Sequence, residues 1–192
     1  MVISFVAELD SFDYNIMEAI DNQVRDTCLH SRRRKPQHSL SKIYSTLINP
    51  DRDPDHLYID SAGASGRGVF AARDINKGEV VAAYLGELIS RAEGLRREKE
   101  RSRNCKTRMC FLFYFTWDGR RYCIDAANSH RIGRYINHSK INLNIYGYVD
   151  TVLGIPHIFF KALSNILAGM ELLYNYDDNR KDVVRAFPWL GK

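Results

Sequence analysis

Two short segments near the C-terminus carry the side chains best suited to chemistry. In Glu171–Tyr176 the phenols of Tyr174 and Tyr176 lie two residues apart. In an extended segment they face the same way, so both can line one pocket. The run Arg134–Ser139 offers guanidinium, amide, imidazole and hydroxyl groups, which suit the binding of a polar ligand.

Short strands are the elements that would position these segments. From residue 57 onward, apolar runs alternate with turn signals, which is the pattern of a compact β-rich fold. The expected strands are Leu57–Asp60, Gly68–Ala72, Val80–Ile89, Arg108–Trp117, Arg120–Asp125, Leu143–Val149 and His157–Leu163. Asp118-Gly119 predicts a two-residue hairpin turn. Two similar turns, 74–79 and 165–171, each place a glycine before an extended segment, which indicates one turn solution used twice.

A charged helix is expected to interrupt the strands. Ser90 and Glu93 form a capping box that opens a helix reaching about Arg103. The stretch 91–108 holds eight basic and three acidic residues, and Leu95 is its one large aliphatic residue. This composition predicts a mostly solvated helix.

The two ends of the chain are expected to be helical. Residues 10–29 have the apolar period of an amphipathic helix, a second short helix fits 39–48, and 51–55 is a turn-rich linker. A last helix covers 178–186. The expected domains are an N-terminal helical flanking segment (1–55), a main domain (56–178, with an insert helix region at 90–107) and a C-terminal helical segment (179–192).

Composition limits the class of protein. The chain has 192 residues, of which 45% are hydrophobic, so it can form one packed core and is too apolar for a disordered tail. We expect no membrane span and no signal peptide, because long apolar stretches and a basic leader are absent from the sequence. The four cysteines lack zinc-site spacing, which predicts no metal and a reducing compartment. The net charge of +5 fits an anionic partner or simply a soluble basic protein.

Five motifs, in order, resemble those of the SET-domain protein lysine methyltransferases. They are Gly66–Phe70, Ala83–Ile89, Tyr122–Ala126, Gly133–Lys140 and Glu171–Asp178. The resemblance covers most of the chain, from about residue 57 to 190. It implies a mainly β (α+β) fold with short helices, namely the SET-domain β-clip of several small sheets with a C-terminal pseudoknot-like crossing. It also implies a methyltransferase that uses S-adenosylmethionine and requires no metal.

Two features resemble one subgroup of this family. Lys140 stands where many members carry a cysteine that binds zinc, and Ala186–Leu190 replaces a cysteine-rich ending. Both resemble the PR-Set subgroup, whose members monomethylate a lysine in the tail of histone H4 within nucleosomes. The implied partner is a histone tail or nucleosome, and the implied location is chromatin in the nucleus. Phe111 departs from the tyrosine usual in this subgroup, which leaves the exact substrate open.

The resemblance implies catalytic roles for three tyrosines. Tyr176 matches the family's catalytic tyrosine, and its ordinary pKa near ~10 favours positioning of the amine over proton abstraction. Tyr174 matches the position where members carry tyrosine or phenylalanine, and tyrosine implies monomethylation. Tyr84 would supply another hydroxyl near the target nitrogen. Each of these tyrosines could instead be a core residue, and for Tyr84 the catalytic and the core interpretation have equal weight.

The same resemblance implies a set of cofactor-binding residues. They are Ser65, Gly66, Arg67, Cys110, Phe111, Asn137, His138 and Trp189. The Asn137 amide would hold the amino-acid end of S-adenosylmethionine, although an Asn-His pair can also cap a turn. Gly66 would allow close backbone approach to the ligand. Trp189 would stack on the adenine or anchor the last helix.

Two basic segments, 32–35 and 91–108, are expected to face nucleosomal DNA, where phosphate contacts make binding depend on salt. A solvated face is the usual alternative for such runs. The first segment also matches a weak nuclear-localisation signal. Two rival functions remain: a catalytically silent SET-fold module that docks on chromatin, and a basic nucleic-acid-binding domain. The presence of Tyr174, Tyr176, Asn137 and His138 argues against the first, and no zinc-finger or helix-turn-helix pattern supports the second.

Overall fold

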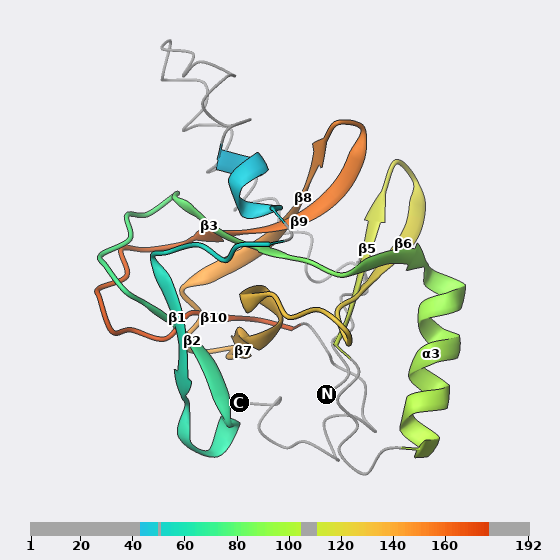
Figure 1. Cartoon of the computed structure of the whole chain (residues 1–192), viewed down its shortest axis with the longest axis horizontal. Helices are drawn as coiled ribbons and strands as arrows, with labels where there is room; N and C mark the ends of the chain where they lie inside the picture. The colour runs from blue at the N-terminus through green and yellow to red at the C-terminus, as the bar shows by residue number, and fades with distance from the viewer. Residues whose placement is uncertain (1–42, 50, 105–110, 177–192) are drawn as a thin grey trace.

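The structure, a computed structural model, describes residues 43–49, 51–104 and 111–176. Within these ranges the strands form four small sheets (Figure 1). Two sheets have two strands each: β1 (Leu57–Ser61) with β2 (Arg67–Ala71), and β7 (Asn137–His138) with β10 (Leu173–Tyr174). In a third sheet β9 (Ile155–Ala162) lies between β3 (Val80–Tyr84) and β8 (Ile145–Val152). In the fourth sheet β6 (Arg120–Asp125) lies between β4 (Glu87–Ser90) and β5 (Leu112–Trp117). The β7–β10 pair is parallel and the others are antiparallel. A mainly β fold of several small sheets is thus confirmed.

The expected strands are confirmed with one main correction. The predicted strand 80–89 is two strands, β3 and β4, which belong to different sheets. They separate at Gly86, where an added Cβ would collide with the carbonyl oxygen of Asp125. Close passage of the chain over β6 therefore requires a glycine at this break. The start of the predicted strand 108–117 lies outside the described residues, and β5 begins at Leu112.

The hairpin turn between β5 and β6 is confirmed. Asp118 and Gly119 have φ values of 47° and 67°. Two successive positive φ angles are what a type I′ turn requires, and Asp and Gly are among the residues that tolerate them. The second hairpin, β8–β9, turns at Leu153 and Gly154 with φ values of 51° and 81°. Leu153 is 97% exposed there, so its side chain contributes no packing to the turn.

The two similar turns, 74–79 and 165–171, pack against each other. Ile75 and Ile166 are buried and exchange backbone hydrogen bonds of 2.8 and 2.9 Å. The first residue of each turn accepts a hydrogen bond from the other turn. Asp74 Oδ1 accepts the Ala168 N–H at 2.8 Å, and Asn165 Oδ1 accepts the Lys77 N–H at 2.9 Å. The turns thus satisfy each other's polar groups, and they support the chain entering β3 and the chain leading to β10.

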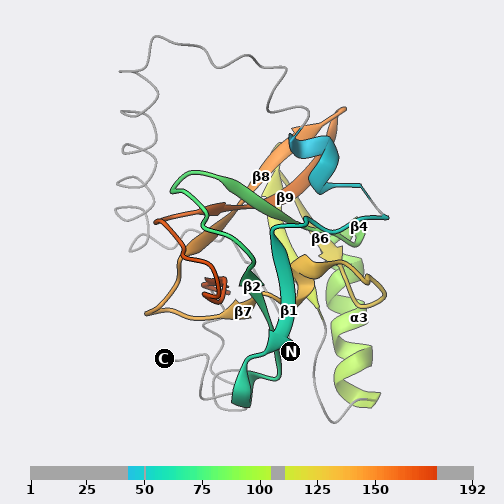
Figure 2. The ribbon, with the colours of Figure 1, turned by 60° about the vertical axis from the view of Figure 1, so that its left-hand side comes forward.

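One helix, α3 (Arg91–Asn104), lies along the β4–β6–β5 sheet (Figures 1 and 2). Ser90 Oγ accepts the Glu93 N–H at 3.2 Å, so the predicted N-cap is confirmed. Most of its described side chains are exposed or half-buried, in line with the predicted solvated helix, and Leu95 itself is 40% exposed. Its buried positions are Gly94 and Glu98, and the Tyr114 hydroxyl donates to Glu98 Oε2 at 2.9 Å.

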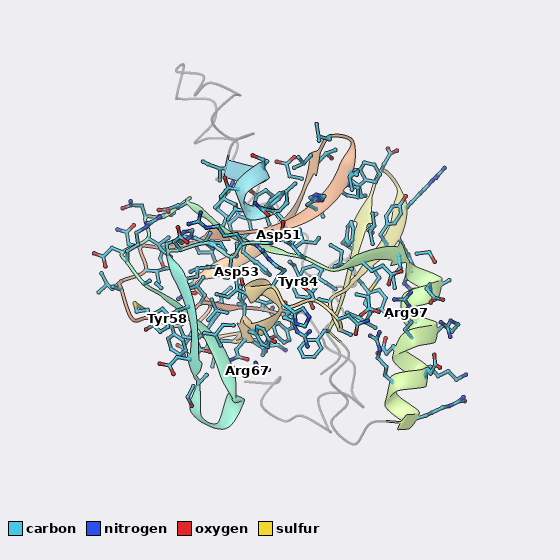
Figure 3. All side chains as sticks on the ribbon, in the orientation of Figure 1. Asp51, Asp53, Tyr58, Arg67, Tyr84 and Arg97 are labelled. Carbon is cyan, nitrogen blue, oxygen red and sulfur yellow. The ribbon has the colours of Figure 1, made fainter. Side chains whose placement is uncertain are left out.

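A buried carboxylate joins α3 to the sheet. Asp125 at the end of β6 accepts hydrogen bonds of 2.7 and 2.9 Å from Arg101 and of 2.8 Å from Arg97. The Asp125 side chain is 3% exposed. Burial opposes its ionisation, but the hydrogen bonds from Arg101 and Arg97 outweigh burial and lower the pKa of the carboxyl. Figure 3 shows Arg97 on the side of α3 that faces the sheet.

The described part of the N-terminal segment packs on the main body. Residues 43–47 are helical, which fits the end of the predicted helix 39–48. Leu47 is buried, and Tyr44 stacks on Phe159 of β9 at 4.3 Å between ring centroids. The irregular stretch 51–55 is held by Asp53, which is labelled in Figure 3. Its Oδ1 accepts the Ile132 N–H at 3.0 Å.

Several sequence predictions concern parts of the chain that the structure leaves undescribed. The helices 10–29 and 178–186 and the basic run 32–35 lie outside the described residues. The division at residues 55 and 178 stays a prediction. Among the described residues, no helix has the length and apolar character needed to span a bilayer, and no cluster of three His, Cys, Asp or Glu side chains is placed to hold a metal ion.

Candidate active site

The parallel pairing of β7 with β10 brings the two C-terminal motifs together. Asn137 lies opposite Leu173, and His138 lies opposite Tyr174. Beyond the strands, the Ser139 N–H donates to the Tyr174 carbonyl at 3.1 Å. The Tyr176 N–H donates to His138 Nδ1 at 2.9 Å. The Asn-His pair and the phenol pair, far apart in sequence, therefore lie side by side.

Asn144 holds the segment that carries the phenols. Its Nδ2 donates to the Glu171 carbonyl at 2.8 Å, and its Oδ1 accepts the Leu173 N–H at 2.9 Å. The Asn144 side chain thus pairs with the backbone as a neighbouring strand would. Because Asn144 is buried, its amide needs partners within the protein, and these two backbone groups supply them.

Three buried phenols meet at this point. Tyr84, Tyr174 and Tyr176 are 0%, 2% and 0% exposed. The Tyr176 hydroxyl donates to the Ile136 carbonyl at 2.5 Å. The hydroxyls of Tyr84 and Tyr174 are buried and have no hydrogen-bond partner among the described residues. An unpaired buried hydroxyl costs about 1–3 kcal/mol, so two in one site call for a functional explanation.

The three phenols are protonated at neutral pH. Burial raises the pKa of each, and the neighbouring Tyr176 raises the pKa of Tyr84 and Tyr174 further. Protonated phenols donate and accept hydrogen bonds but make poor bases. This environment favours positioning of a ligand over abstraction of a proton from it.

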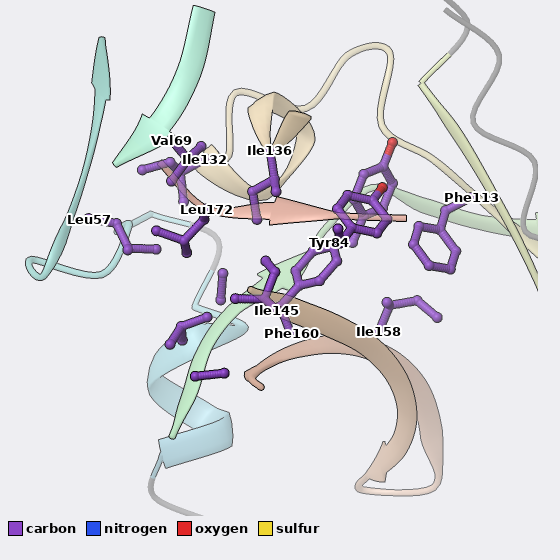
Figure 4. Packing of buried hydrophobic residues seen from close by; sticks show 14 of the residues in the cluster. Leu57, Val69, Tyr84, Phe113, Ile132, Ile136, Ile145, Ile158, Phe160 and Leu172 are labelled. Carbon is purple, nitrogen blue, oxygen red and sulfur yellow. The ribbon is translucent and has the colours of Figure 1, made fainter. Parts of the chain in front are cut away.

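Aromatic side chains from other strands surround the phenols. The Phe160 ring of β9 lies 4.8 Å from that of Tyr174. The Phe113 ring of β5 lies 5.2 Å from that of Tyr84, and all of these residues belong to one core cluster (Figure 4). The rings of Tyr174 and Tyr176 are 4.7 Å apart. Dense packing of this kind leaves each phenol little rotational freedom.

A second group of predicted residues gathers around Asn137. Its Nδ2 donates to the Arg67 carbonyl at 3.1 Å and to Glu171 Oε1 at 2.8 Å. Its Oδ1 accepts no hydrogen bond from the described residues. Arg67 follows Gly66, whose φ of 81° and ψ of −120° favour glycine. The structure thus places Gly66, Arg67 and Asn137 in one neighbourhood, on β2 and β7.

The remaining predicted residues lie beside or outside this group. Phe111 packs against Arg134, whose guanidinium carbon lies 3.7 Å from the ring centroid. Arg134 also lies 5.2 Å from the ring centroid of Tyr135, and Arg67 lies 4.3 Å from that same ring. Ser65 is exposed at the end of a 3₁₀ helix (Gly63–Ser65). Cys110 and Trp189 lie outside the described residues.

Comparison with known proteins matches this arrangement to a family. The SET-domain family model matches residues 66–177, which include the phenol pair and the Asn-His pair. The chain belongs to the SET-domain family. The resemblance predicted from the five motifs is therefore confirmed.

Relatives of this SET domain include named methyltransferases. The chain is 37% identical to N-lysine methyltransferase KMT5A-B of Xenopus laevis, over 87% of this chain and 49% of that protein. It is 36% identical to histone-lysine N-methyltransferase Set8 of Drosophila melanogaster, over 71% of this chain and 20% of that protein. The chain thus spans about half or less of the length of these relatives.

Solved structures of SET domains agree with the fold. A crystal structure of CpSET8 from Cryptosporidium aligns with a TM-score of 0.63 and 31% identity, over 79% of this chain and 71% of that one. The Polycomb complex ctPRC2, in an autoinhibited conformation bound to S-adenosylmethionine, aligns with a TM-score of 0.54 and 34% identity, over 69% of this chain and 16% of that one.

Sequence reasoning missed several groups that shape the site of this SET domain. They are the carbonyl of Ile136 and the side chains of Asn144, Phe160 and Glu171. Glu171 opens the closing motif, so its position was visible, but its contact with Asn137 was not. Phe160 and Asn144 carry no local signal, because Phe160 is one of several apolar residues in β9 and Asn144 is a polar residue just before β8.

Proposed function

We propose that this chain is an S-adenosylmethionine-dependent protein lysine N-methyltransferase that monomethylates a histone tail lysine. The observation that carries the proposal is the pair of buried phenol oxygens without partners, on Tyr84 and Tyr174, next to Tyr176. A substrate amine that enters between them would supply the missing hydrogen-bond partner. The Xenopus and Drosophila relatives, which are named as lysine N-methyltransferases, support the same reaction.

The aromatic surroundings suit a lysine amine. A lysine in water has a pKa near ~10.4, so at neutral pH little of it is unprotonated. A buried apolar environment lowers the pKa of an amine and favours the neutral, nucleophilic form. The Tyr176 hydroxyl donates a hydrogen bond to the Ile136 carbonyl, so its oxygen is oriented to accept a hydrogen bond from an amine N–H. We assign Tyr176, Tyr174 and Tyr84 to the positioning of the target nitrogen.

The residues around Asn137 fit the cofactor. S-adenosylmethionine, when bound, supplies a methyl group on a positively charged sulfur. Its amino-acid end carries an ammonium and a carboxylate. Asn137 Oδ1 is an acceptor without a described partner, and the exposed Arg67 guanidinium has no ion pair among the described residues. We propose Ser65, Gly66, Arg67, Asn137 and His138 as the cofactor site, and keep Cys110, Phe111 and Trp189 as its further members.

Methyl transfer from labelled S-adenosylmethionine to nucleosomes and to free histones tests this proposal. We expect incorporation into a histone tail, with monomethyl-lysine as the product by mass spectrometry. Calorimetry with the same cofactor separates the rival function. Undetectable binding of the cofactor would favour a catalytically silent module that docks on chromatin. We propose chromatin in the nucleus as the location of the protein.

The phenol of Tyr174 is expected to limit the number of methyl groups transferred. Tyr174→Phe removes a hydroxyl that lies among the three phenols and leaves room for a methylated amine or a water. We expect the variant to produce dimethyl-lysine where the wild-type chain stops at monomethyl-lysine. Mass spectrometry of a histone peptide after extended reaction measures the ratio. A purely monomethyl product from the variant would remove Tyr174 from the proposed site.

The outer side of α3 is proposed to contact nucleosomal DNA. Arg96, Arg97 and Arg101 are engaged in ion pairs within the protein. The exposed Lys99 and Arg103 have no ion pair or hydrogen bond among the described residues. They lie four residues apart, so they share one side of the helix. Among the described residues of α3, Lys99 and Arg103 are therefore the exposed basic side chains that are free to meet phosphates.

The double change Lys99→Ala/Arg103→Ala is expected to weaken nucleosome binding and its salt dependence. Two lost phosphate contacts would lower the slope of log affinity against log salt by about 2. Electrophoretic mobility shifts at several salt concentrations measure this slope. Activity on a free histone peptide should stay unchanged, and Lys77→Ala, an exposed lysine on the 74–79 turn, serves as the control. An unaltered slope would remove α3 from the interface.

A further inference from the structure

Glu171 is a charged group that the proposed mechanism does not yet use. Its Oε1 accepts a hydrogen bond of 2.8 Å from Asn137 Nδ2. The carboxylate has no cationic partner among the described residues. A half-buried carboxylate without a counter-charge is costly unless a ligand supplies one. Asn137 is its one hydrogen-bond donor in the described part of the chain.

The position of this carboxylate is fixed by its surroundings. An added Cβ on Gly68 would collide with Glu171 Oε1, so the carboxylate fills space that the glycine leaves on β2. The backbone of Glu171 forms an antiparallel bridge with Phe70, and its carbonyl accepts the Asn144 amide. Glu171 is therefore held from both β2 and the loop before β8, with its carboxylate aimed at Asn137.

This contact determines how the Asn137 amide is turned. One Nδ2 hydrogen goes to the Arg67 carbonyl and the other to Glu171. Both partners accept only, so the amide cannot flip without placing its oxygen against a carbonyl and a carboxylate. Oδ1 must then point away from both, where it accepts no bond from the described residues.

We infer that Glu171 is a positioning residue that fixes the Asn137 amide as a hydrogen-bond acceptor and supplies negative charge for the ammonium group at the amino-acid end of the cofactor. The inference rests on the proposed function and deepens it. Glu171 acts through Asn137, so its effect should fall on ligands that carry an ammonium group.

Calorimetry with S-adenosylhomocysteine tests this inference. Glu171→Gln keeps the shape and removes the charge, and we expect binding about 10-fold weaker, since hydrogen bonds to charged groups are roughly twice as strong as neutral ones. Glu171→Ala should weaken binding further. 5′-Methylthioadenosine lacks the amino-acid end, so its affinity should fall less than about 2-fold in either variant, as expected for groups that do not contact each other. Glu79→Gln, a carboxylate paired with Arg73 on the other turn, is the matched control.

A second measurement needs no cofactor. In the free protein, the two side-chain amide protons of Asn137 should exchange slowly with solvent in nuclear magnetic resonance spectra, because both are bonded. Glu171→Ala should make one of them exchange fast. In activity assays the variants should raise KM for S-adenosylmethionine and leave KM for the histone peptide unchanged.

The outcomes separate this inference from the proposed function. Equal binding of S-adenosylhomocysteine by wild type and Glu171→Gln would overturn the role of Glu171 alone. Equal losses for S-adenosylhomocysteine and 5′-methylthioadenosine would show a general structural effect and also overturn it. Failure of the wild-type chain to bind either ligand would overturn both the inference and the proposed function.

Discussion

Replacing Tyr176 with phenylalanine is expected to lower kcat for methyl transfer about 100-fold, the typical effect of removing one pre-oriented hydrogen-bonding group from an active site. The Tyr176 hydroxyl is fixed by its 2.5 Å bond to Ile136, so its oxygen has one orientation. Phenylalanine keeps the ring contacts with Tyr174 and His138 and loses only this oxygen. Steady-state assays with labelled S-adenosylmethionine and a histone peptide measure the change.

Two controls test whether the loss of activity in Tyr176→Phe is specific to the positioning of the amine. Calorimetry should give nearly unchanged cofactor binding for Tyr176→Phe, because the hydroxyl is assigned to the amine. Tyr148→Phe is the matched control, since this phenol is also hydrogen-bonded, to Tyr44 at 3.1 Å, but on the far side of β8 from the phenol cluster. Loss of activity in both variants, or in neither, would contradict the assigned role of Tyr176.

The second large effect is expected from Asp125→Asn, which should lower the free energy of unfolding by about 3 kcal/mol, as is typical when one partner of a buried ion pair is removed. The change leaves Arg101 and Arg97 facing an uncharged amide at a site that is 3% exposed. Arg97 retains Glu87 and Glu93 as partners, which limits the loss. Urea unfolding at pH 7 measures the difference from wild type.

The ion pairs of Asp125 with Arg97 and Arg101 also predict how the stability of the fold depends on pH. The pKa of Asp125 is lower in the folded chain than in the unfolded chain, where an aspartate titrates near ~3.9. Its contribution is therefore complete above that value and is lost as the pH falls through the lower folded pKa. Unfolding curves between pH 5 and pH 2, at roughly one-unit steps, should converge for wild type and Asp125→Asn. Asp55→Asn, which removes an exposed pair with Arg52, should leave stability unchanged at pH 7.

Local patterns were enough to predict most elements of the fold. The strand β6 and the turn at Asp118-Gly119 follow from a β-rich run and a turn-specific dipeptide, and both act within a few residues. The start of α3 follows from Ser90, whose hydroxyl caps the next turn. Membership of the SET-domain family followed from motif order, and with it a list of site residues.

The contacts that assemble the site depend on distant residues, so the sequence alone could not predict them. Strands β7 and β10 are two residues long and pair in parallel, a pattern with no local period. Composition predicted a solvated α3 but not its attachment, because Asp125 lies 24 residues beyond Arg101. Likewise, the break at Gly86 depends on the approach of Asp125, which no property of the run 80–89 reveals.

The reciprocal bonding of the turns 74–79 and 165–171 has a consequence for how this sequence can vary. Surface turns usually tolerate inserted or deleted residues. Here each turn supplies backbone donors and a side-chain acceptor that the other needs, so a change of length in one leaves polar groups of the other unmatched. The turn at Leu153-Gly154 has no such reciprocal bonds among the described residues, and Leu153 is almost fully exposed. This turn is therefore a better place for an epitope tag or a fluorescent label.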